Sequence, residues 1–471
     1  MRVTLALVTT VALTACGGRA APALPGALHT VHDVSPPRLT ILHPASRTAP
    51  GLIFVAEKGG KDRPSGPVIA DNRGRIVWYH QVPHGLEATD FRAQTYRGGP
   101  VLTWWQGTIS KAGVGRGEYV VYDDAYRELL TLKAGHDLDG DLHEFQLTPR
   151  GTAYVPVYHE VPADLRSVGG PQAGYVYDSV VQELDLQSGD VVFEWHSVGH
   201  VPFTESLQAH REPAKHATRK RPLDYFHVNS VKDAPGGNII ISARNTSTLY
   251  LLRRDGSIAW RLGGKRSDFG PPAAVKFRFQ HDAHLRADGT LTLFDNGAIP
   301  KLEPFTRPLV LKLDLAARHV SAARAFVHPQ KISSPFEGNL QTLDDGGALV
   351  GWGGVRKVTE FTPDAKVRFE LKLPYGDTYR AYRLPWSGRP GGRPSVAVSG
   401  NRVYASWNGK SDIASWEVLT GRDADHLTPS ARHDWAGLET AIRIGQSPGT
   451  VAVRALDASG RTLGVSETIT P

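Results

Sequence analysis

A turn glycine followed by a strongly apolar run recurs along most of the chain. These runs are rich in β-branched and aromatic residues, which is typical of β-strands bounded by turns. The repeat interval is about fifty residues, and one longer interval, from Gly151 to Gly237, contains two polar insertions. The recurring phrases are "APGLIFVAEK" (49–58), "YRGGPVLTWW" (96–105), "TPRGTAYVPVY" (148–158), "APGGNIIISAR" (234–244), "RADGTLTLFDN" (286–296) and "LDDGGALVGWG" (343–353).

A second phrase follows the first in several of these units. It is a strand, a glycine turn and a strand that ends near tryptophan, as in "LLRRDGSIAWRLGG" (251–264). Each unit therefore offers about four short strands, the number in one blade of a β-propeller. We predict an all-β fold with a six-bladed β-propeller over residues 45–387. A β-sandwich stays open as an alternative, because short strands alone do not separate the two architectures.

The pattern changes after "GRPGGRP", a linker that begins at Gly388. Residues 388–471 alternate apolar and polar positions between Gly and Asn turns, and about seven short strands would make a small β-sandwich. This module resembles a fibronectin type III domain, with Trp407 and Trp416 as expected core residues. It shows no pattern of catalytic residues.

Residues 1–16 have the form of an export signal, with Arg2 as the positive charge and residues 3–15 as the apolar segment. The segment ends in "LTAC", which resembles the bacterial lipobox, where the cysteine becomes a lipid-modified N-terminus. We therefore expect a lipoprotein, exported and anchored on the outer face of the bacterial cytoplasmic membrane, with residues 17–44 as tether and lead-in. Cleavage at an ordinary small-residue site is the alternative. Because Cys16 is the only cysteine, no internal disulfide is expected.

Positive charge is spread along the chain of 471 residues, whose net charge is +7. The densest cluster, "HATRKRPL" (216–223), is typical of a solvated loop and not of a nucleic-acid footprint. We therefore expect no nucleic acid partner. The acidic phrase "HDLDGDLHE" (136–144) lacks the spacing and the late glutamate of a calcium loop.

Three histidines stand at matching positions in three of the repeated units. His143 and His281 each precede their turn glycine by eight residues, and His227 precedes its glycine by ten. The innermost strand of each propeller blade lines the central channel, so equivalent positions lie at one height around one axis. We therefore expect these three imidazoles to converge.

Converging imidazoles suit two kinds of chemistry. Neutral imidazoles hold zinc or another transition metal, whereas imidazoles that donate hydrogen bonds hold an anion, and one imidazole can act as nucleophile or general acid. Arg244, at the end of "NIIISAR", favours the anion, because a guanidinium repels a metal cation and fits an oxyanion. We therefore expect neither a metal nor a cofactor.

Several phrases together resemble the arylsulfotransferase (arylsulfate sulfotransferase) family, in its actinobacterial and fungal branch. The resemblance covers about residues 50–385 and implies a six-bladed propeller that moves a sulfuryl group from an aryl sulfate donor to a phenolic acceptor. It implies no nucleotide sulfate donor (PAPS) and no metal. The phrases are "DLHEFQLTPRGTAYV", "QELDLQSGDVVFEWHS", "DYFHVNSV", "ISARNTSTLYLL", "WRLGGKRSDF" and "FQHDAH".

The resemblance also implies residue roles. His281, in the "QH" phrase, matches the histidine that takes the sulfuryl group covalently, while His227 and Arg244 match the residues that bind its oxygens. His143 matches a further histidine of an earlier blade. The chain departs from the characterised branch after His281, where Asp282 replaces a hydroxyl-bearing residue, and it has no cysteine pair.

The expected reaction is a two-step displacement through a sulfo-histidine, with ping-pong kinetics and with His143 or His284 as base. Two other functions stay open: a propeller that binds an anion or a partner without turnover, and a metal- or quinone-dependent oxidoreductase. Blade packing is the alternative role for the two tryptophans. The expected substrate-binding residues are Asn229, His284, Trp104 and Trp105.

Overall fold

The computed structural model describes residues 28–31, 34–60, 63–208, 212–269, 276–299, 301, 303–445 and 449–471. Strands make up 48% of the structure and helices 4%, so the predicted all-β class is confirmed. Among the described residues no helix is long and apolar enough to cross a membrane. The expected lipidation residue, Cys16, lies outside the described residues.

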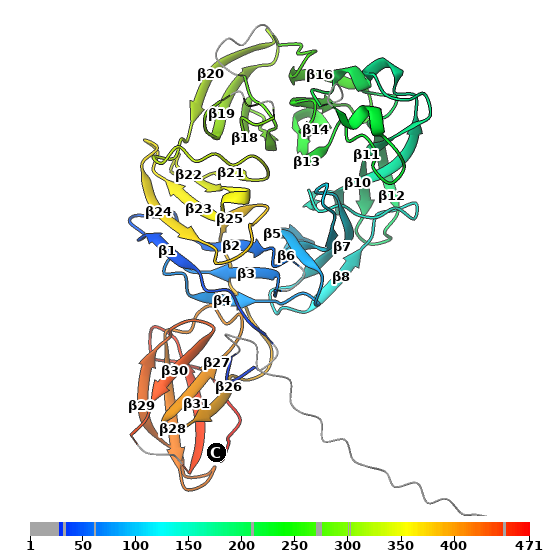
Figure 1. Cartoon of the computed structure of the whole chain (residues 1–471). Coiled ribbons are helices and arrows are strands. Elements are labelled where there is room, and N and C mark those ends of the chain that lie inside the picture. The colour runs from blue at the N-terminus through cyan, green and yellow to red at the C-terminus, as the bar shows by residue number, and fades with distance from the viewer. Residues whose placement is uncertain are drawn as a thin grey trace, which may run out of the picture.

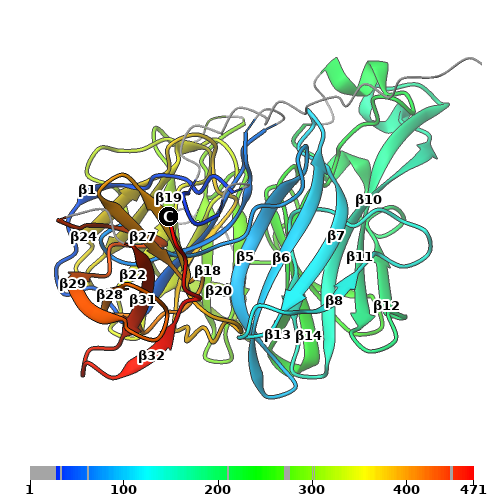
Figure 2. The same ribbon diagram turned by 90° about the horizontal axis from the view of Figure 1, so that it is seen from below.

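Six antiparallel sheets lie around a common axis (Figure 1). The first sheet is β25 (Ala381–Leu384), β2 (Leu52–Glu57), β3 (Gly66–Ala70) and β4 (Ile76–Tyr79). The second is β5 (Glu87–Tyr96), β6 (Gly99–Ile109), β7 (Gly115–Tyr122) and β8 (Glu128–Leu132), seen side by side in Figure 2. The third is β9 (Gln146–Leu147), β10 (Thr152–Ala163), β11 (Gly174–Asp185) and β12 (Val191–His196).

The remaining three sheets of this group continue the same order. The fourth is β13 (Val228–Ala234), β14 (Asn238–Ala243), β15 (Thr248–Leu252) and β16 (Ile258–Gly263). The fifth is β17 (His281–Leu285), β18 (Thr290–Asp295), β19 (Arg307–Asp314) and β20 (His319–Ala325). The sixth is β21 (Asn339–Thr342), β22 (Ala348–Gly351), β23 (Lys357–Phe361), β24 (Val367–Lys372) and β1 (Thr40–His43).

Both ends of this segment are tied together by strand pairing. β25 pairs with β2, so that Ala381 lies opposite Val55, and β1 pairs with β24. The first sheet therefore combines strands from the two ends of the segment, and its hydrogen bonds fix them together. Short 3-10 helices connect some strands: η1 (Arg166–Val168), η2 (Phe203–Glu205), η3 (Glu212–His216), η4 (Pro235–Gly237) and η5 (Gly353–Val355).

Two further sheets form the C-terminal module, which lies beside β4 in Figure 1. Trp416 is fully buried in its core, and Trp407 packs against that core. The amide of Asn408 makes reciprocal hydrogen bonds with the main chain of Tyr79, at 3.1 and 2.8 Å. The strands of the module are β26 (Ser395–Ser399), β27 (Arg402–Ser406), β30 (Glu439–Arg443), β29 (Thr428–Asp434), β28 (Ser415–Gly421), β31 (Thr450–Leu456) and β32 (Thr462–Val465).

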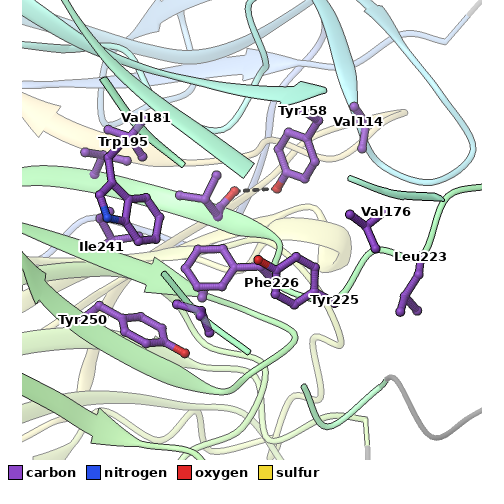
Figure 3. Close-up of a cluster of buried hydrophobic side chains, with 14 of the residues drawn as sticks. Val114, Tyr158, Val176, Val181, Trp195, Leu223, Tyr225, Phe226, Ile241 and Tyr250 are labelled. Atoms are coloured by element: carbon purple, nitrogen blue, oxygen red, sulfur yellow. Dashed lines mark hydrogen bonds between the residues drawn. The ribbon is translucent and has the colours of Figure 1, made fainter. Parts of the chain in front are cut away.

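Apolar side chains fill the space between neighbouring sheets, as the cluster around Trp195 and Phe226 illustrates (Figure 3). Tyr158, on β10, lies at the edge of this cluster and donates a hydrogen bond to the carbonyl of Val228 at 2.6 Å, drawn dashed in the figure. Because this bond joins the third sheet to the start of β13, it also fixes the residue before it, His227.

A network of buried charges joins the innermost strands at the axis. Arg380 is completely buried and donates to Asp90 at 2.9 Å and to both oxygens of Glu144, at 2.7 and 3.0 Å. Burial opposes ionisation of Glu144, but the charges of Arg380 and Arg92 hold its pKa well below the usual range. The network balances three carboxylates against three cations: Asp90, Glu144, Asp282, Arg92, Lys232 and Arg380.

The same network holds main-chain atoms in place. Arg380 also donates to the carbonyl oxygens of His143 and Asn229, each at 3.1 Å. The members come from five of the six sheets or from the residues just before them. Asn339, which begins β21 of the sixth sheet, exchanges two hydrogen bonds with the main chain of Ala381, next to Arg380. Arg380 and the neighbouring Ala381 therefore connect all six sheets.

We expect Arg380→Met to destabilise the protein by about 3–5 kcal/mol, because the substitution leaves buried carboxylates without their cation. Chemical unfolding followed by tryptophan fluorescence measures this loss. Arg116→Met is the matched control, since Arg116 pairs with Asp139 and Glu160 on the surface with its side chain 58% exposed. Equal unfolding midpoints for the two variants would contradict the role given to Arg380.

Candidate active site

The structure brings the three predicted histidines together. His143 lies just before β9, His227 just before β13, and His281 begins β17. The ring centroids of His143 and His227 are 4.9 Å apart, and the Tyr379 ring lies 5.4 Å from His143 and 6.4 Å from His281. All three imidazoles are buried, with residue exposures of 4%, 0% and 1%. Residues far apart in sequence thus meet because each starts an inner strand.

Two of the imidazoles face a carboxylate through Nδ1. His227 Nδ1 lies 2.5 Å from Asp224 Oδ2, and His143 Nδ1 makes a close contact with Asp141. A carboxylate accepts the Nδ1 proton and fixes the ring, so the Nε2 atom is the one left for chemistry. At His227 the charge of Asp224 also favours the protonated ring.

His281 differs, because its Nδ1 faces an amide. The Oδ1 atom of Asn296 lies 2.7 Å from His281 Nδ1. The Nδ2 group of Asn296 donates to the carbonyls of Ser334 and Glu337, each at 2.9 Å, which determines which end of the amide faces the imidazole. Since the amide oxygen only accepts, His281 must donate from Nδ1. Its Nε2 therefore carries the lone pair.

That lone pair is weakly engaged. The main-chain N–H of Glu337 donates to His281 Nε2 at 3.3 Å, near the upper limit for a hydrogen bond. Burial, and next the charge of Arg244, hold the pKa of His281 well below its usual value. At neutral pH His281 is thus an uncharged imidazole with a lone pair on Nε2, which is the form that attacks an electrophile.

Arg244 supplies positive charge beside the imidazoles. It follows β14, and its main-chain N–H donates to the carbonyl of His227 at 2.9 Å. The guanidinium stacks on Phe279, 4.5 Å from the ring centroid, and its Nη2 lies 3.4 Å from Asp224 Oδ2. The side chain is 16% exposed, so part of the guanidinium can still meet a ligand. A planar donor in this place fits an oxyanion.

His227 combines two unusual features. Its backbone φ is +59°, a left-handed conformation that β-strand residues avoid and that marks a constrained position. Its Nε2 is buried and, among the described residues, has no hydrogen-bond partner. Burial, and next the charge of Arg244, lower the pKa of His227 to about 4, against the opposing charge of Asp224. An anion at Nε2 would reverse this balance and favour the protonated ring.

Asn229 and two tyrosines complete the walls. Asn229 donates from Nδ2 to the carbonyl of Gln280 at 2.7 Å, while its buried Oδ1 has no partner among the described residues. The hydroxyl of Tyr379 donates to the carbonyl of Asn229 at 2.8 Å, and that of Tyr158 to the carbonyl of Val228. Because these phenolic protons are committed to the main chain, the two tyrosines shape the site and leave the chemistry to the imidazoles.

The structure does not bring Trp104, Trp105 and His284 to this cluster. Both tryptophans are fully buried between sheets; Trp104 donates to Gln106 Oε1 at 3.1 Å and Trp105 to the carbonyl of Gly140 at 3.0 Å. His284 lies beyond an irregularity in β17 and lines a different cavity of about 500 Å³, together with members of the buried charge network. The two tryptophans therefore pack the core, and His284 belongs to the other end of the inner strands.

Sequence reasoning missed the groups that orient the imidazoles. Asp141 and Asp224 stand two and three residues before their histidines, a short spacing that marks them only after the histidines are chosen. Asn296 lies one residue past the end of β18, the strand that pairs with β17. No group of three or more His, Cys, Asp or Glu arranged to hold a metal ion occurs within the part of the chain that the structure describes.

The solved structures that match this chain share little sequence with it. A protein of unknown function from Bacteroides caccae is 12% identical, with a TM-score of 0.43, and the match covers 71% of this chain and 98% of that one. Virginiamycin B lyase from Staphylococcus aureus is 11% identical, with a TM-score of 0.31 and coverage of 78% and 94%. A search of curated proteins gave no significant match.

A family model matches the segment that contains the site. The arylsulfotransferase (ASST) model aligns with residues 92–373, which is more than half of the chain and includes His143, His227, Arg244 and His281. The match covers the inner strands that bring the imidazoles together. The chain therefore belongs to the arylsulfotransferase (ASST) family.

Proposed function

We propose that this protein is a PAPS-independent arylsulfate sulfotransferase that moves a sulfuryl group from a phenolic sulfate ester to an acceptor phenol through a sulfo-histidine on His281. Membership of the family supports the reaction class. One observation carries the mechanism: Asn296 holds His281 in the tautomer whose Nε2 has the lone pair, beside Arg244.

In the first step His281 Nε2 attacks the sulfur atom while the bond from sulfur to the phenolic oxygen breaks. Arg244, His227 and His143 donate to the three remaining oxygens. Fixed donors of this kind act most strongly in a site that excludes water, where they stabilise the charge of a loose transition state. The burial of all three imidazoles supports such an environment.

The second step reverses the first with a new phenol. The acceptor oxygen attacks the sulfur atom, the sulfur–nitrogen bond breaks, and His281 returns to its neutral form. Because donor and acceptor react in turn at the same nitrogen, the scheme requires ping-pong kinetics. The cluster that holds the oxygens serves both steps.

We propose the following organisation for the whole chain. The six sheets act as the blades of a propeller whose axis holds the imidazoles, a proposal that the closure of the first sheet by β25 and β2 supports. The C-terminal module is a β-sandwich of the fibronectin type III kind, and the sequence pattern points to the actinobacterial and fungal branch. Cys16 anchors the exported protein by a lipid on the outer face of the cytoplasmic membrane.

We expect His281→Ala to reduce acceptor-dependent release of a phenol from its aryl sulfate by roughly a thousandfold or more, because the covalent route is lost. The wild type, treated with donor alone, should gain the mass of one sulfuryl group on the peptide that contains His281. His159→Ala, at an exposed position on β10, is the matched control. Full activity of a folded His281→Ala variant would refute the proposed nucleophile.

The pH dependence tests the state of His281. Attack requires the neutral ring, so the rate of the first step falls as the pH drops through the pKa of His281. Because that pKa lies well below 6.5, we expect single-turnover release from a nitrophenyl sulfate to stay constant through pH 6.5 and to fall only at more acidic pH. A wild-type rate that halves near pH 6.5 would contradict the environment assigned to His281.

Asn296→Asp tests the role of the amide. A carboxylate at Nδ1 stabilises the imidazolium, so the pKa of His281 rises. The acid limb of the pH–rate profile, where the rate falls with decreasing pH, then moves to higher pH. The same single-turnover measurement reports the shift, with thermal unfolding as the check of folding. An unmoved acid limb in a folded variant would show that the amide does not control the basicity of His281.

A further inference from the structure

Glu337 is tied to the reacting nitrogen through its main chain. Its N–H donates to His281 Nε2 at 3.3 Å, and its carbonyl accepts from Asn296 at 2.9 Å. Its φ is +60°, in the left-handed region, where a residue other than glycine is held only by its surroundings. The chain is thus constrained at the point where it passes His281.

The side chain of Glu337 is only partly satisfied. Lys58 contacts Oε1 and also pairs with Asp377 at 2.8 Å. The Oε2 atom is buried and has no hydrogen-bond partner among the described residues. An unpaired buried carboxylate oxygen is costly, and it keeps the capacity to accept a hydrogen bond or a proton.

The electrostatic surroundings adjust Glu337 to proton transfer near neutral pH. Burial raises its pKa to about 7, against the opposing charge of Lys58 and with further negative charge from Asp377 and Glu87. The carboxylate also acts on Arg244 and Tyr379, which places its charge within reach of the imidazole cluster. A carboxyl group with this pKa exchanges a proton readily in either direction.

Two exposed aromatic residues stand near Glu337 and Asp377 in the sequence. Phe336, the residue before Glu337, is 41% exposed, and Tyr375, two residues before Asp377, is 43% exposed. Both lie against the segment that follows β22: a Cβ at Gly354 would come within 2.7 Å of the Phe336 ring, and Arg356 donates to the carbonyl of Tyr375 at 2.7 Å.

We propose that Glu337 is the general acid–base of this site: as a carboxylate it takes the proton from the hydroxyl of the acceptor phenol, and as a carboxylic acid it returns that proton to the departing phenolate. This inference rests on the proposed sulfuryl transfer and adds the group that handles its proton.

The two steps balance with this assignment. In the first, an aryl sulfate, neutral His281 and protonated Glu337 give sulfo-His281, a phenol and the Glu337 carboxylate. In the second, the carboxylate removes the proton of the new phenol as its oxygen attacks sulfur, and the products are an aryl sulfate, neutral His281 and protonated Glu337. No co-reactant is consumed, so one proton cycles between substrate and enzyme.

The histidines are less suited to this task. His143 and His227 each commit Nδ1 to a carboxylate and are needed at Nε2 as donors to the sulfuryl oxygens. His284 lines the other cavity. Among the described residues, Glu337 combines a main-chain contact to His281 Nε2 with a free carboxylate oxygen.

The experiment compares Glu337→Gln with the wild type over acceptor phenols of different acidity. We expect the second step to slow by about a hundredfold with an acceptor whose pKa is about 10, because general-base catalysis is lost. With a nitrophenol that is already ionised, the two proteins should differ little. Rates that change equally for all acceptors would overturn the proposal, since a merely structural effect would not depend on the acceptor proton.

Release from a nitrophenyl sulfate donor, which needs no acid, separates this proposal from the proposed function. A variant that forms sulfo-His281 normally is folded and active in the first step, so a selective defect in the second step is due to Glu337. If the wild type forms no sulfo-histidine, the proposed function itself fails. If the Gln variant does not fold, Glu337→Ala replaces it, and wild-type rates with the un-ionised acceptor would then overturn the assignment.

Asp377→Asn is the matched control, because it removes a carboxylate on the same Lys58 without removing the proposed base. Loss of this negative charge lowers the pKa of Glu337, so the acid limb of the second step should move to lower pH while the dependence on acceptor acidity stays. An acid limb that does not move would mean that the limb belongs to another group, and the proposal would be rejected.

Discussion

The buried ion network around Arg380 is the constraint on which the rest of the structure depends. Charges can occupy the centre of a fold only when each is paired, because removing an ion from water costs more than a single contact returns. Here the pairing partners come from different sheets, so satisfying the charges requires the sheets to meet. The strand that follows Arg380 completes the first sheet. The Arg380 guanidinium also donates to the carbonyls of His143 and Asn229. Stability and site geometry therefore share one cause.

The three imidazoles show how the Nδ1 partner can divide roles among identical side chains. The Asp224 carboxylate acts to raise the pKa of His227 against burial and the charge of Arg244, so it supports the ring as a donor once an anion binds. The amide beside His281 fixes the ring equally well but adds no negative charge. Burial and Arg244 then keep that ring neutral. Under the proposed reaction, His281 becomes the nucleophile because its Nδ1 partner is the uncharged amide oxygen of Asn296. The histidines that bind the oxyanion have charged carboxylate partners instead.

Much of this arrangement was predictable, because alternation and turn glycines report directly on half-buried strands. The spacing of His143, His227 and His281 from their glycines places each at the start of an inner strand, which suffices to predict that they converge. Trp104 and Trp105 show the limit: an aromatic residue in a strand has the same pattern whether it faces a channel or a neighbouring sheet. The pairing of Asp90 with Arg380, 290 residues apart, has no local signal. Tyr379 and Glu337 precede their strands in segments without periodicity.

The charge balance of the site bears on which ester it can hold. Arg244 is near Asp224, so its positive charge is largely compensated before any ligand binds. The adjacent network is itself neutral, and Lys58 is shared by Glu337 and Asp377. Such a site offers little surplus positive charge, and a dianionic phosphate monoester would remain undercompensated. A sulfate monoester carries a single negative charge, which one proton taken up at His227 can match, with Asp224 supporting the imidazolium that forms. Under the proposed reaction, this balance of charge favours a singly charged sulfate ester over a dianionic phosphate ester.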